Sequence, residues 1–394
     1  VLLNNDIGVS TAAHMLNVGK LVAFPTETVY GLGANAFNET AVHEVFRMKG
    51  RPSSDPLIVH VANADMMYTL FDFNSDNQSM QSYEQNYAAK VCAALSTAFW
   101  PGPLTLVHKA SAHVPAIVCA NTGQVGVRCP KHPLTLKLLE AAGVPIAAPS
   151  ANRFGHVSPT CAQHVLDDLG ACDVAVLQDD PVLTGGCSIG VESTVCRVSE
   201  DGRCVSILRC GAVTVPMIER ALREAGLAAC QVAQQSVLPS TDTQHQQPVT
   251  EAAVSPGQMI RHYSPDIPTY IKRSLPATTV EAVAQPVAEI TDLTSVCNAL
   301  VIDFGGQLQY LRSQCRHYTD LSSTADPNEA CTKLFSALRH GESEEMRILG
   351  VTHILLPDLS NIHCNEENSS EASEKGLVHA LWERLHRAAA GTFI

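Results

Sequence analysis

The stretch FPTETVYGLGANA at residues 24–36 decides the fold assignment. It overlaps the apolar run LVAF at 21–24, which has the composition of a buried strand. Thr26, Glu27 and Thr28 therefore stand where that strand ends. Because open α/β sheets bind ligands at the ends of their strands, two hydroxyls and a carboxylate at this place indicate a ligand site. The alternative is that these residues are turn formers that bond their own backbone.

Two short patterns suggest other sites. GLGANA at 31–36 fits the G-x-G-x-x-A pattern of a dinucleotide-binding turn, and Asp55 follows at about the distance of a ribose-binding acid. That turn must come directly after a strand, whereas the polar PTETVY separates these glycines from LVAF. GCSIG at 186–190, around Ser188, matches a nucleophile elbow, but a turn precedes it and a strand-like run follows. Both patterns are therefore disfavoured.

Strand-like and helical segments alternate from about residue 20 to 210. PLIVHV at 56–61 and PLTLV at 103–107 begin with proline and are apolar, as strands bounded by turns are. A helix is predicted over 39–49, because Asn38 is a good N-cap and Gly50 a good C-terminal stop. The alternation predicts an α/β domain.

A second α/β segment is predicted beyond a linker. Residues 231–256 are rich in Gln, Ser, Thr and Pro and hold few core-forming residues, which predicts the linker. Strand-like and helical runs alternate after it, a pattern typical of a small parallel-sheet domain. The runs are IPTYIK (267–272), NALVIDF (298–304), EACTKLFSALRH (329–340), THILLPD (352–358) and GLVHALWERLHRAAA (376–390).

Composition restricts the function classes. The chain has 394 residues, 45% of them hydrophobic, and a net charge of −13, which opposes non-specific binding to nucleic-acid phosphates. Its 14 cysteines include no C-x-x-C pair, which disfavours zinc ribbons and favours free thiols in a reducing compartment. The sequence shows no apolar run long enough for a transmembrane helix and no signal-peptide pattern. We therefore expect a cytoplasmic protein with no membrane partner.

Basic residues in this acidic chain mark a candidate anion site. Arg47, Lys49 and Arg51 fall within five residues, at a predicted helix end that runs into a proline turn. They form a candidate triphosphate clamp, although cations also favour helix C-termini for electrostatic reasons alone. Arg128 closes the strand-like QVGVR, and His60 ends PLIVHV, where a buried core histidine is the simpler interpretation. Cations combined with hydroxyls favour a small anionic ligand.

Several segments taken together resemble one family. They are FPTETVYGLGA (24–34), KGRPSSDPLIVHV (49–61), FWPGPLTLV (99–107), VGVRCP (125–130), APSANRFGHVSPT (148–160), SIGVESTV (188–195) and ILRCG (207–211). In order and approximate spacing they resemble the YrdC-like threonylcarbamoyl-AMP synthases. SPGQMIRHYSP at 255–265 and GLVHALWERLHRAA at 376–389 resemble the linker motif and the Rossmann-like C-terminal domain of the long form of that family.

The resemblance implies an α/β fold and a reaction. A YrdC-like domain at 1–215, with a twisted mixed sheet enclosing a ligand cavity, would precede a linker or lid at 216–265 and a smaller Rossmann-like domain at 266–394. L-Threonine and bicarbonate would form a carbamate that attacks the α-phosphate of ATP, leaving threonylcarbamoyl-AMP and pyrophosphate. Mg²⁺ would accompany ATP, with no prosthetic group and no protein metal site. The product would pass to a tRNA threonylcarbamoyl transferase, so direct tRNA binding is not required.

The resemblance also implies roles for individual side chains. Lys49 and Arg51 would grip the phosphates as the catalytic residues, and Tyr263 of the linker would cover the nucleotide. The other residues implied for ATP are Asp55, Gln124, Ser150, Asn152, Ser158 and Arg209. Those implied for L-threonine are Thr28, His60, Ala148, Ser188 and Arg128, the last as the partner of its carboxylate.

Two other functions stay open on the sequence. A carbamoyl-adenylating maturation factor would share the YrdC-like domain, but it normally also carries paired C-x-x-C zinc motifs and an acylphosphatase module, which this sequence does not show. A non-catalytic RNA-binding module would need a basic surface, which the net charge of −13 opposes. IDFGG at 302–306 has no phosphate-binding fingerprint, so we expect the C-terminal domain to support the lid.

Overall fold

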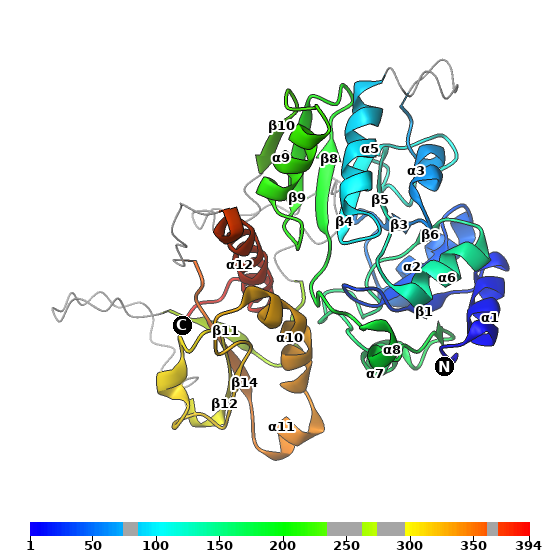
Figure 1. The fold of residues 1–394 in the computed structure, drawn as a ribbon. Coiled ribbons are helices and arrows are strands. Elements are labelled where there is room, and N and C mark those ends of the chain that lie inside the picture. Colours follow the sequence, from blue (N-terminus) through cyan, green and yellow to red (C-terminus); the bar gives the residue numbers. More distant parts are fainter. Residues whose placement is uncertain (74–85, 235–261, 274–295, 361–368) are drawn as a thin grey trace.

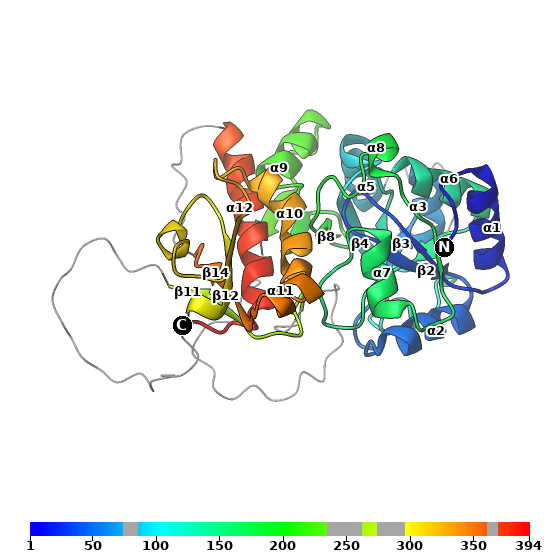
Figure 2. The same cartoon turned by 90° about the horizontal axis from the view of Figure 1, so that it is seen from below.

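The computed structural model describes residues 1–73, 86–234, 262–273, 296–360 and 369–394 (Figure 1). Within these residues the strands form one large and one small sheet. Two helices of the small domain lie between its sheet and the large domain (Figures 1 and 2). Among the described helices, none combines the length and the apolarity needed to cross a membrane.

The large sheet mixes parallel and antiparallel neighbours. Among the described residues its ten strands run, from edge to edge, in the order β10 (Gln231–Gln234), β9 (Cys204–Arg209), β8 (Thr194–Val198), β4 (Leu104–Lys109), β5 (Gln124–Arg128), β3 (Ile58–His60), β6 (Ile146–Ala147), β2 (Gly31–Asn35), β1 (Val22–Phe24) and β7 (Ala175–Val176). The pairs β3 with β5 and β4 with β8 are parallel, whereas β1 with β2 and β4 with β5 are antiparallel. This confirms the predicted mixed-sheet fold.

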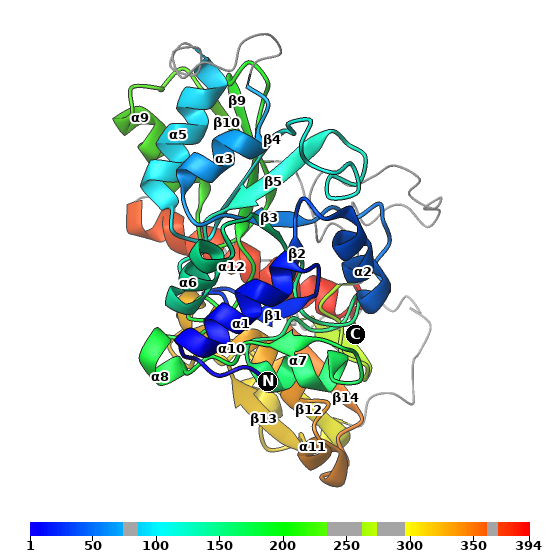
Figure 3. The same ribbon diagram turned by 90° about the vertical axis from the view of Figure 1, so that its right-hand side faces the viewer.

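Helices cover the large sheet. They are α1 (Asp6–Asn17), α2 (Glu39–Lys49), α3 (Ala64–Leu70), α5 (Tyr87–Phe99), α6 (Pro133–Ala142), α7 (Ala162–Leu169), α8 (Pro181–Thr184) and α9 (Val215–Glu224). α3, α5 and α9 lie side by side on one face of the sheet (Figure 3). The helix predicted over 39–49 is confirmed as α2, because the Asn38 side chain accepts from the Ala41 N–H and Gly50 ends it in the left-handed conformation.

The glycines of GLGANA have a packing role. Gly31 and Gly33 lie inside β2, which pairs antiparallel with β1, so they do not form a turn between a strand and a helix. A Cβ atom on Gly33 would lie 2.6 Å from the Phe24 ring and 2.7 Å from the Ile146 side chain. These contacts explain the glycine without a dinucleotide. The segment around Ser188 likewise leads into strand β8 and not into a helix, so it is no nucleophile elbow.

The first domain extends past the boundary that the resemblance implies. Residues 216–234, assigned to the linker or lid, contain most of α9 and all of β10. β10 pairs in parallel with β9 and adds an edge strand to the large sheet. The described part of the large sheet therefore reaches Gln234. Most of the predicted linker and of the lid motif, residues 235–261, lies outside the described residues.

The small domain is built on a parallel sheet. Its described strands run in the order β11 (Thr269–Lys272), β14 (His353–Pro357), β12 (Ala299–Asp303) and β13 (His317–Asp320). Its helices are α10 (Pro327–His340), α11 (Glu344–Ile348) and α12 (Ser369–Ala388), with short 3-10 helices at Val296–Asn298 and Gln309–Leu311. Neighbouring strands are all parallel, which agrees with the predicted Rossmann-like arrangement.

One hydrophobic cluster joins the two domains. Val29 and Val157 from loops of the large domain pack in the same cluster as Phe335 of α10 and Leu381 of α12. Tyr263, from the end of the linker motif, belongs to this cluster and is 1% exposed. The two domains therefore share an apolar core, and the linker tyrosine is part of it.

Candidate active site

The loop after β1 contributes to a buried cavity. Thr26 is a turn former, because its Oγ1 donates to the Val29 carbonyl (2.6 Å) and accepts from the N–H groups of Thr28 and Val29. Thr28 instead meets Arg128, whose Nη1 donates to Thr28 Oγ1 over 2.9 Å. Glu27 Oε1 lies 2.7 Å from Arg128 Nη2, and both side chains are buried. The loop thus holds both a turn former and groups that face the cavity.

Two side chains meet at one end of the central strands. β3 and β5 run in parallel with His60 opposite Arg128, so both strands end at the same edge of the sheet. His60 also meets Phe24 edge-on, with ring centroids 5.7 Å apart. Burial, reinforced by the nearby Arg128 charge, lowers the pKa of His60 to about 3. His60 is therefore a neutral hydrogen-bonding group in this cavity.

Cations from the end of α2 and the turn after it form a second part of the site. Lys49 Nζ donates to the Ser150 carbonyl over 2.6 Å and also to that of Asn152. Arg51 forms an ion pair with Asp55 over 3.0 Å. Burial, helped by the neighbouring Arg51, lowers the pKa of Lys49 well below its ordinary value, and burial raises the pKa of Asp55. These buried charges favour an anionic ligand at this end.

The third cation is Arg209, from strand β9 near one edge of the large sheet. Arg209 ends β9 and donates to both the carbonyl and the Oγ of Ser193, each over 3.1 Å. The neighbouring Glu192 accepts a hydrogen bond from Ser158 Oγ over 2.7 Å. Arg47, by contrast, is exposed and pairs with Glu44 on its own helix. The basic trio of the sequence is thus divided: Lys49 and Arg51 are buried at the site, and Arg47 faces solvent.

The end of the linker motif closes the cavity. The Tyr263 ring lies 5.3 Å from that of Phe335 and meets His262 edge-on at 4.0 Å. Burial raises the pKa of Tyr263 and, together with the surrounding arginines, lowers that of His262. Both side chains line the cavity. The volume that the centre of a water molecule can occupy in this cavity is about 50 Å³. A nucleotide can therefore enter only if some of these side chains move.

Most of the implied site residues come together. Those that line the cavity are Thr28, Arg51, His60, Arg128, Ala148, Ser150, Arg209 and Tyr263. A second set is buried behind them and connected to the site by hydrogen bonds or an ion pair, namely Lys49, Asp55, Asn152 and Ser158. The segments that resemble the family therefore assemble into one buried site, although they are far apart in the sequence.

Two implied residues do not reach the cavity. Gln124 begins β5 whereas Arg128 ends it, and four steps along a strand at roughly 3.3 Å each put them about 13 Å apart. Ser188 is exposed, and its carbonyl accepts a hydrogen bond from Thr332 of α10. In this structure neither residue is part of the cavity lining. Their implied roles in binding ATP and L-threonine stay predictions.

Sequence reasoning left out several residues of the site. They are Glu192, Ser193 and His262, which line the cavity. All three lie inside the segments quoted for the family resemblance. What the sequence does not show is that the carboxylates of Glu27 and Glu192 are buried next to arginines, because those partners lie far away along the chain.

Comparisons with known proteins identify the family. Residues 14–211 match the Sua5/YciO/YrdC family profile, described as "Telomere recombination", and residues 213–390 match the profile described as "Threonylcarbamoyl-AMP synthase, C-terminal domain". The chain belongs to the Sua5/YciO/YrdC family. The resemblance carried by the quoted segments is thereby confirmed.

Relatives of this Sua5-type chain include threonylcarbamoyl-AMP synthases. The one from Pyrococcus abyssi is 39% identical over 64% of this chain and 64% of its own length, and the one from Bacillus subtilis is 38% identical over 70% of this chain and 69% of its own. A solved structure of P. abyssi Sua5 complexed with L-threonine matches with a TM-score of 0.69 and 31% identity. That match covers 99% of this chain and 96% of the P. abyssi chain.

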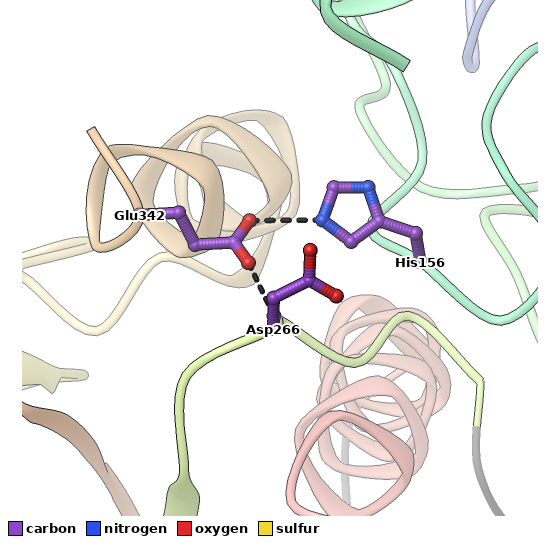
Figure 4. Close-up of side chains that lie close together, drawn as sticks. All are labelled: His156, Asp266 and Glu342. Atoms are coloured by element: carbon purple, nitrogen blue, oxygen red, sulfur yellow. Dashed lines mark hydrogen bonds and ion pairs between the residues drawn. The ribbon is translucent and has the colours of Figure 1, made fainter. Parts of the chain in front are cut away.

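A second cluster of charges joins the domains of this Sua5-type chain. Figure 4 shows His156, Asp266 and Glu342, whose ligand atoms all lie within 4.8 Å of one another. His156 Nε2 bonds to Glu342 (2.9 Å) and its Nδ1 to Asp168 (2.8 Å). Burial alone would lower the pKa of His156, but these two hydrogen bonds raise it to about 9. The described contacts of this cluster are ion pairs and hydrogen bonds among its own charged groups, including Arg153 with Asp266.

Proposed function

We propose that this chain is a threonylcarbamoyl-AMP synthase, which condenses L-threonine, bicarbonate and ATP into threonylcarbamoyl-AMP and pyrophosphate. The observation that carries the proposal is the buried site with Arg128 in one part and Lys49, Arg51 and Arg209 in another. Such an arrangement suits two anionic substrates that would otherwise repel each other. The names of the relatives support the same activity.

Arg128 would bind the carboxylate of L-threonine. Its guanidinium has five N–H donors: Nε donates to the Gly102 carbonyl over 3.3 Å, one on Nη1 serves Thr28 and one on Nη2 faces Glu27. The remaining donors can take a second carboxylate in a bidentate arrangement. Neutral His60 beside it can donate or accept a hydrogen bond without adding charge. The L-threonine complex of P. abyssi Sua5 supports this assignment of substrate.

The cations at the other part of the site would hold the triphosphate. The carbamate oxygen attacks the α-phosphorus, the bond from that phosphorus to the bridging oxygen breaks, and pyrophosphate leaves with both electrons of that bond. Lys49, Arg51 and Arg209 would offset the negative charge that develops on the phosphate oxygens. Phosphate binding would also return the depressed pKa of Lys49 toward its ordinary value, because an anion favours the charged ammonium.

Mg²⁺ would enter with ATP. Among the described residues, each carboxylate found at the site has an arginine partner: Glu27 with Arg128, Asp55 with Arg51, and Glu192 with Arg384. Carboxylates held in this way are poorly placed to bind a cation, so phosphate oxygens and water would supply most of its ligands. The free thiols of the described cysteines are consistent with a cytoplasmic enzyme whose product passes to a tRNA threonylcarbamoyl transferase.

The proposal is tested by incubating the protein with ATP, Mg²⁺, bicarbonate and L-threonine. Pyrophosphate is measured enzymatically and the adenylate by mass, with L-serine and a reaction lacking bicarbonate as controls. We expect an adenylate of the mass of threonylcarbamoyl-AMP that depends on both threonine and bicarbonate. Pyrophosphate released only with carbamoyl phosphate would identify a carbamoyl-adenylating factor instead. Absence of any adenylate would contradict the proposed synthesis.

A further inference from the structure

The last helix of the chain inserts an arginine into the catalytic domain. Arg384 of α12 is fully buried, with 0% of its surface exposed. Its Nη1 donates to the carbonyl of Cys210, the residue that follows β9, over 2.6 Å. Its Nε lies 3.4 Å from Glu192 Oε2. A side chain of the small domain thus directly contacts two residues next to the nucleotide part of the site.

Glu192 connects this arginine with the cavity. Its carboxylate lies between Arg384 and Ser158, since Oε2 faces Arg384 and Oε1 accepts from Ser158 Oγ over 2.7 Å. Glu192 itself lines the cavity, and the adjacent Ser193 accepts from Arg209. A continuous series of polar contacts therefore runs from α12 through Glu192 to Ser158.

Tyr263 is held by the same helix pair. Its ring lies 5.3 Å from that of Phe335 of α10, and the guanidinium of Arg384 lies over it at 5.9 Å. Among the described residues, neither Tyr263 Oη nor Arg384 Nη2 has a hydrogen-bond partner, although both atoms are buried. Buried polar atoms of this kind are rare where no ligand or water serves them. Tyr263 lines the cavity, and Arg384 lies behind it against the cavity residue Glu192.

Burying the Arg384 guanidinium carries a desolvation penalty. A buried arginine requires compensating charges, and here Glu192 and Glu383 supply them. Glu383 is also shared with Arg387 of the same helix. Leucine or methionine at this position would pack between the domains without any of these charges. The arginine is therefore better explained by what it orients than by cohesion of the interface.

We propose that Arg384 is a positioning residue of the nucleotide site, which orients Glu192 and Ser158 and supports the ring of Tyr263. The site is then incomplete without the small domain. In the L-threonine part of the site, by contrast, Arg128 and its neighbours Thr28 and His60 all come from the large domain. This inference rests on the proposed function in so far as the nucleotide is ATP.

The test compares Arg384→Met, which keeps the length but removes the charge, with Arg384→Lys, Glu192→Gln and the Arg384→Met/Glu192→Gln double variant. Arg347→Met, on the exposed helix α11, is the matched control. We expect Arg384→Met to raise KM and Kd for ATP about tenfold or more and to leave KM for L-threonine within about twofold. Lysine should restore part of the loss. The double variant should lose no more than Arg384→Met, because both changes break one contact.

The results distinguish failure of the Arg384 proposal from failure of the synthase proposal. Titration calorimetry with ATP needs no turnover, so it tests Arg384 even if wild-type protein forms no adenylate and the synthase proposal fails. An unchanged ATP affinity in Arg384→Met, equal losses of ATP and threonine affinity, or additive effects in the double variant would overturn the positioning role. If Arg384→Met does not fold, Arg384→Lys and Glu192→Gln carry the test, because both keep the site filled.

Discussion

The cavity and the cluster around His156 both bury charged side chains, but they use them differently. In the cluster, Asp168 accepts from His156 (2.8 Å) and from Arg339 (2.9 Å), and Glu342 accepts from His156. Each charge there has an opposite charge in contact. In the cavity, by contrast, His60 Nδ1 and Tyr263 Oη are buried with no hydrogen-bond partner among the described residues.

The contrast distinguishes charges that hold the two domains together from polar groups that are available to a ligand. Asp168 lies on α7 of the large domain, whereas Arg339 and Glu342 lie in the small domain, so the cluster ties the two domains together. Its charged groups pair with one another, although Arg339 Nε has no hydrogen-bond partner among the described residues. The cavity contains buried polar atoms that have no hydrogen-bond partner among the described residues, as expected where a ligand completes the site. Substitutions in the two regions should therefore differ in what they change.

The largest effect is expected at Arg128. Arg128→Met removes the partner of the substrate carboxylate and leaves Glu27 as an unpaired buried charge. We expect kcat/KM for L-threonine to fall about a thousandfold, which corresponds to ~4 kcal/mol. The measurement is pyrophosphate release as a function of threonine concentration. Arg197→Met, at a half-buried position of strand β8, is the control, and a loss below tenfold at Arg128 would contradict the assignment.

The largest effect on stability is expected at Asp168. Asp168→Ala leaves His156 and Arg339 as buried cations without their shared partner. Breaking a buried pair in this way costs about 3–5 kcal/mol. Denaturant unfolding measures the loss, and Asp167→Ala, an exposed neighbour on α7, is the control. If Asp168→Ala and Asp167→Ala had the same unfolding midpoint, the cluster would not be a source of cohesion.

The cluster also predicts a pH dependence with a definite sign. The pKa of His156 is raised to about 9 in the fold from 6.5, so its contribution is full below pH 6.5 and is lost as the pH rises through about 9. The difference amounts to at most ~3 kcal/mol. Unfolding midpoints of wild type and His156→Gln should therefore converge between pH 6.5 and 9.5. A gap that stays constant over this range would show that the protonated imidazole is not what stabilises the cluster.

The smallest of these effects is expected at Lys49, where activity and stability should change in opposite directions. Lys49→Met removes a phosphate ligand, and we expect kcat/KM for ATP to fall about a hundredfold, or ~3 kcal/mol. Because burial penalises the charged ammonium, the apolar side chain should leave the melting temperature unchanged or slightly higher. Lys137→Met on the surface of α6 is the control. A marked drop in melting temperature would instead make Lys49 a structural residue.

Local patterns predicted the elements well. Asn38 and Gly50 bound α2 as expected, and the runs that contain β1, β3, β4 and β14 are strands. The short β13 was not predicted, because HYTD at 317–320 has neither an apolar run nor strict alternation. Strand β10 was not predicted within the linker, because it is stabilised by pairing with β9 and not by its own composition.

The candidate site also contains residues that the sequence indicated and residues whose placement the sequence did not decide. The motifs predicted Lys49, Arg51 and Arg128, because cations in an acidic chain are visible in the sequence itself. Gln124 directly precedes the segment VGVRCP and Ser188 begins SIGVESTV, yet Gln124 begins a strand whose other end reaches the cavity and Ser188 faces solvent. A motif brings a segment to the site but does not decide which of its side chains point inward.

The sequence by itself determined the family, the order of the elements and the cations that an anionic ligand needs, because these depend on residue identity and near neighbours along the chain. Only the tertiary structure decided that Glu27 lies against Arg128 and that Arg384, from the last helix, lies against Glu192. Those pairs join residues that are distant in the sequence. Burial makes each of them strong, and burial is a property of the packed fold that no local stretch of sequence carries.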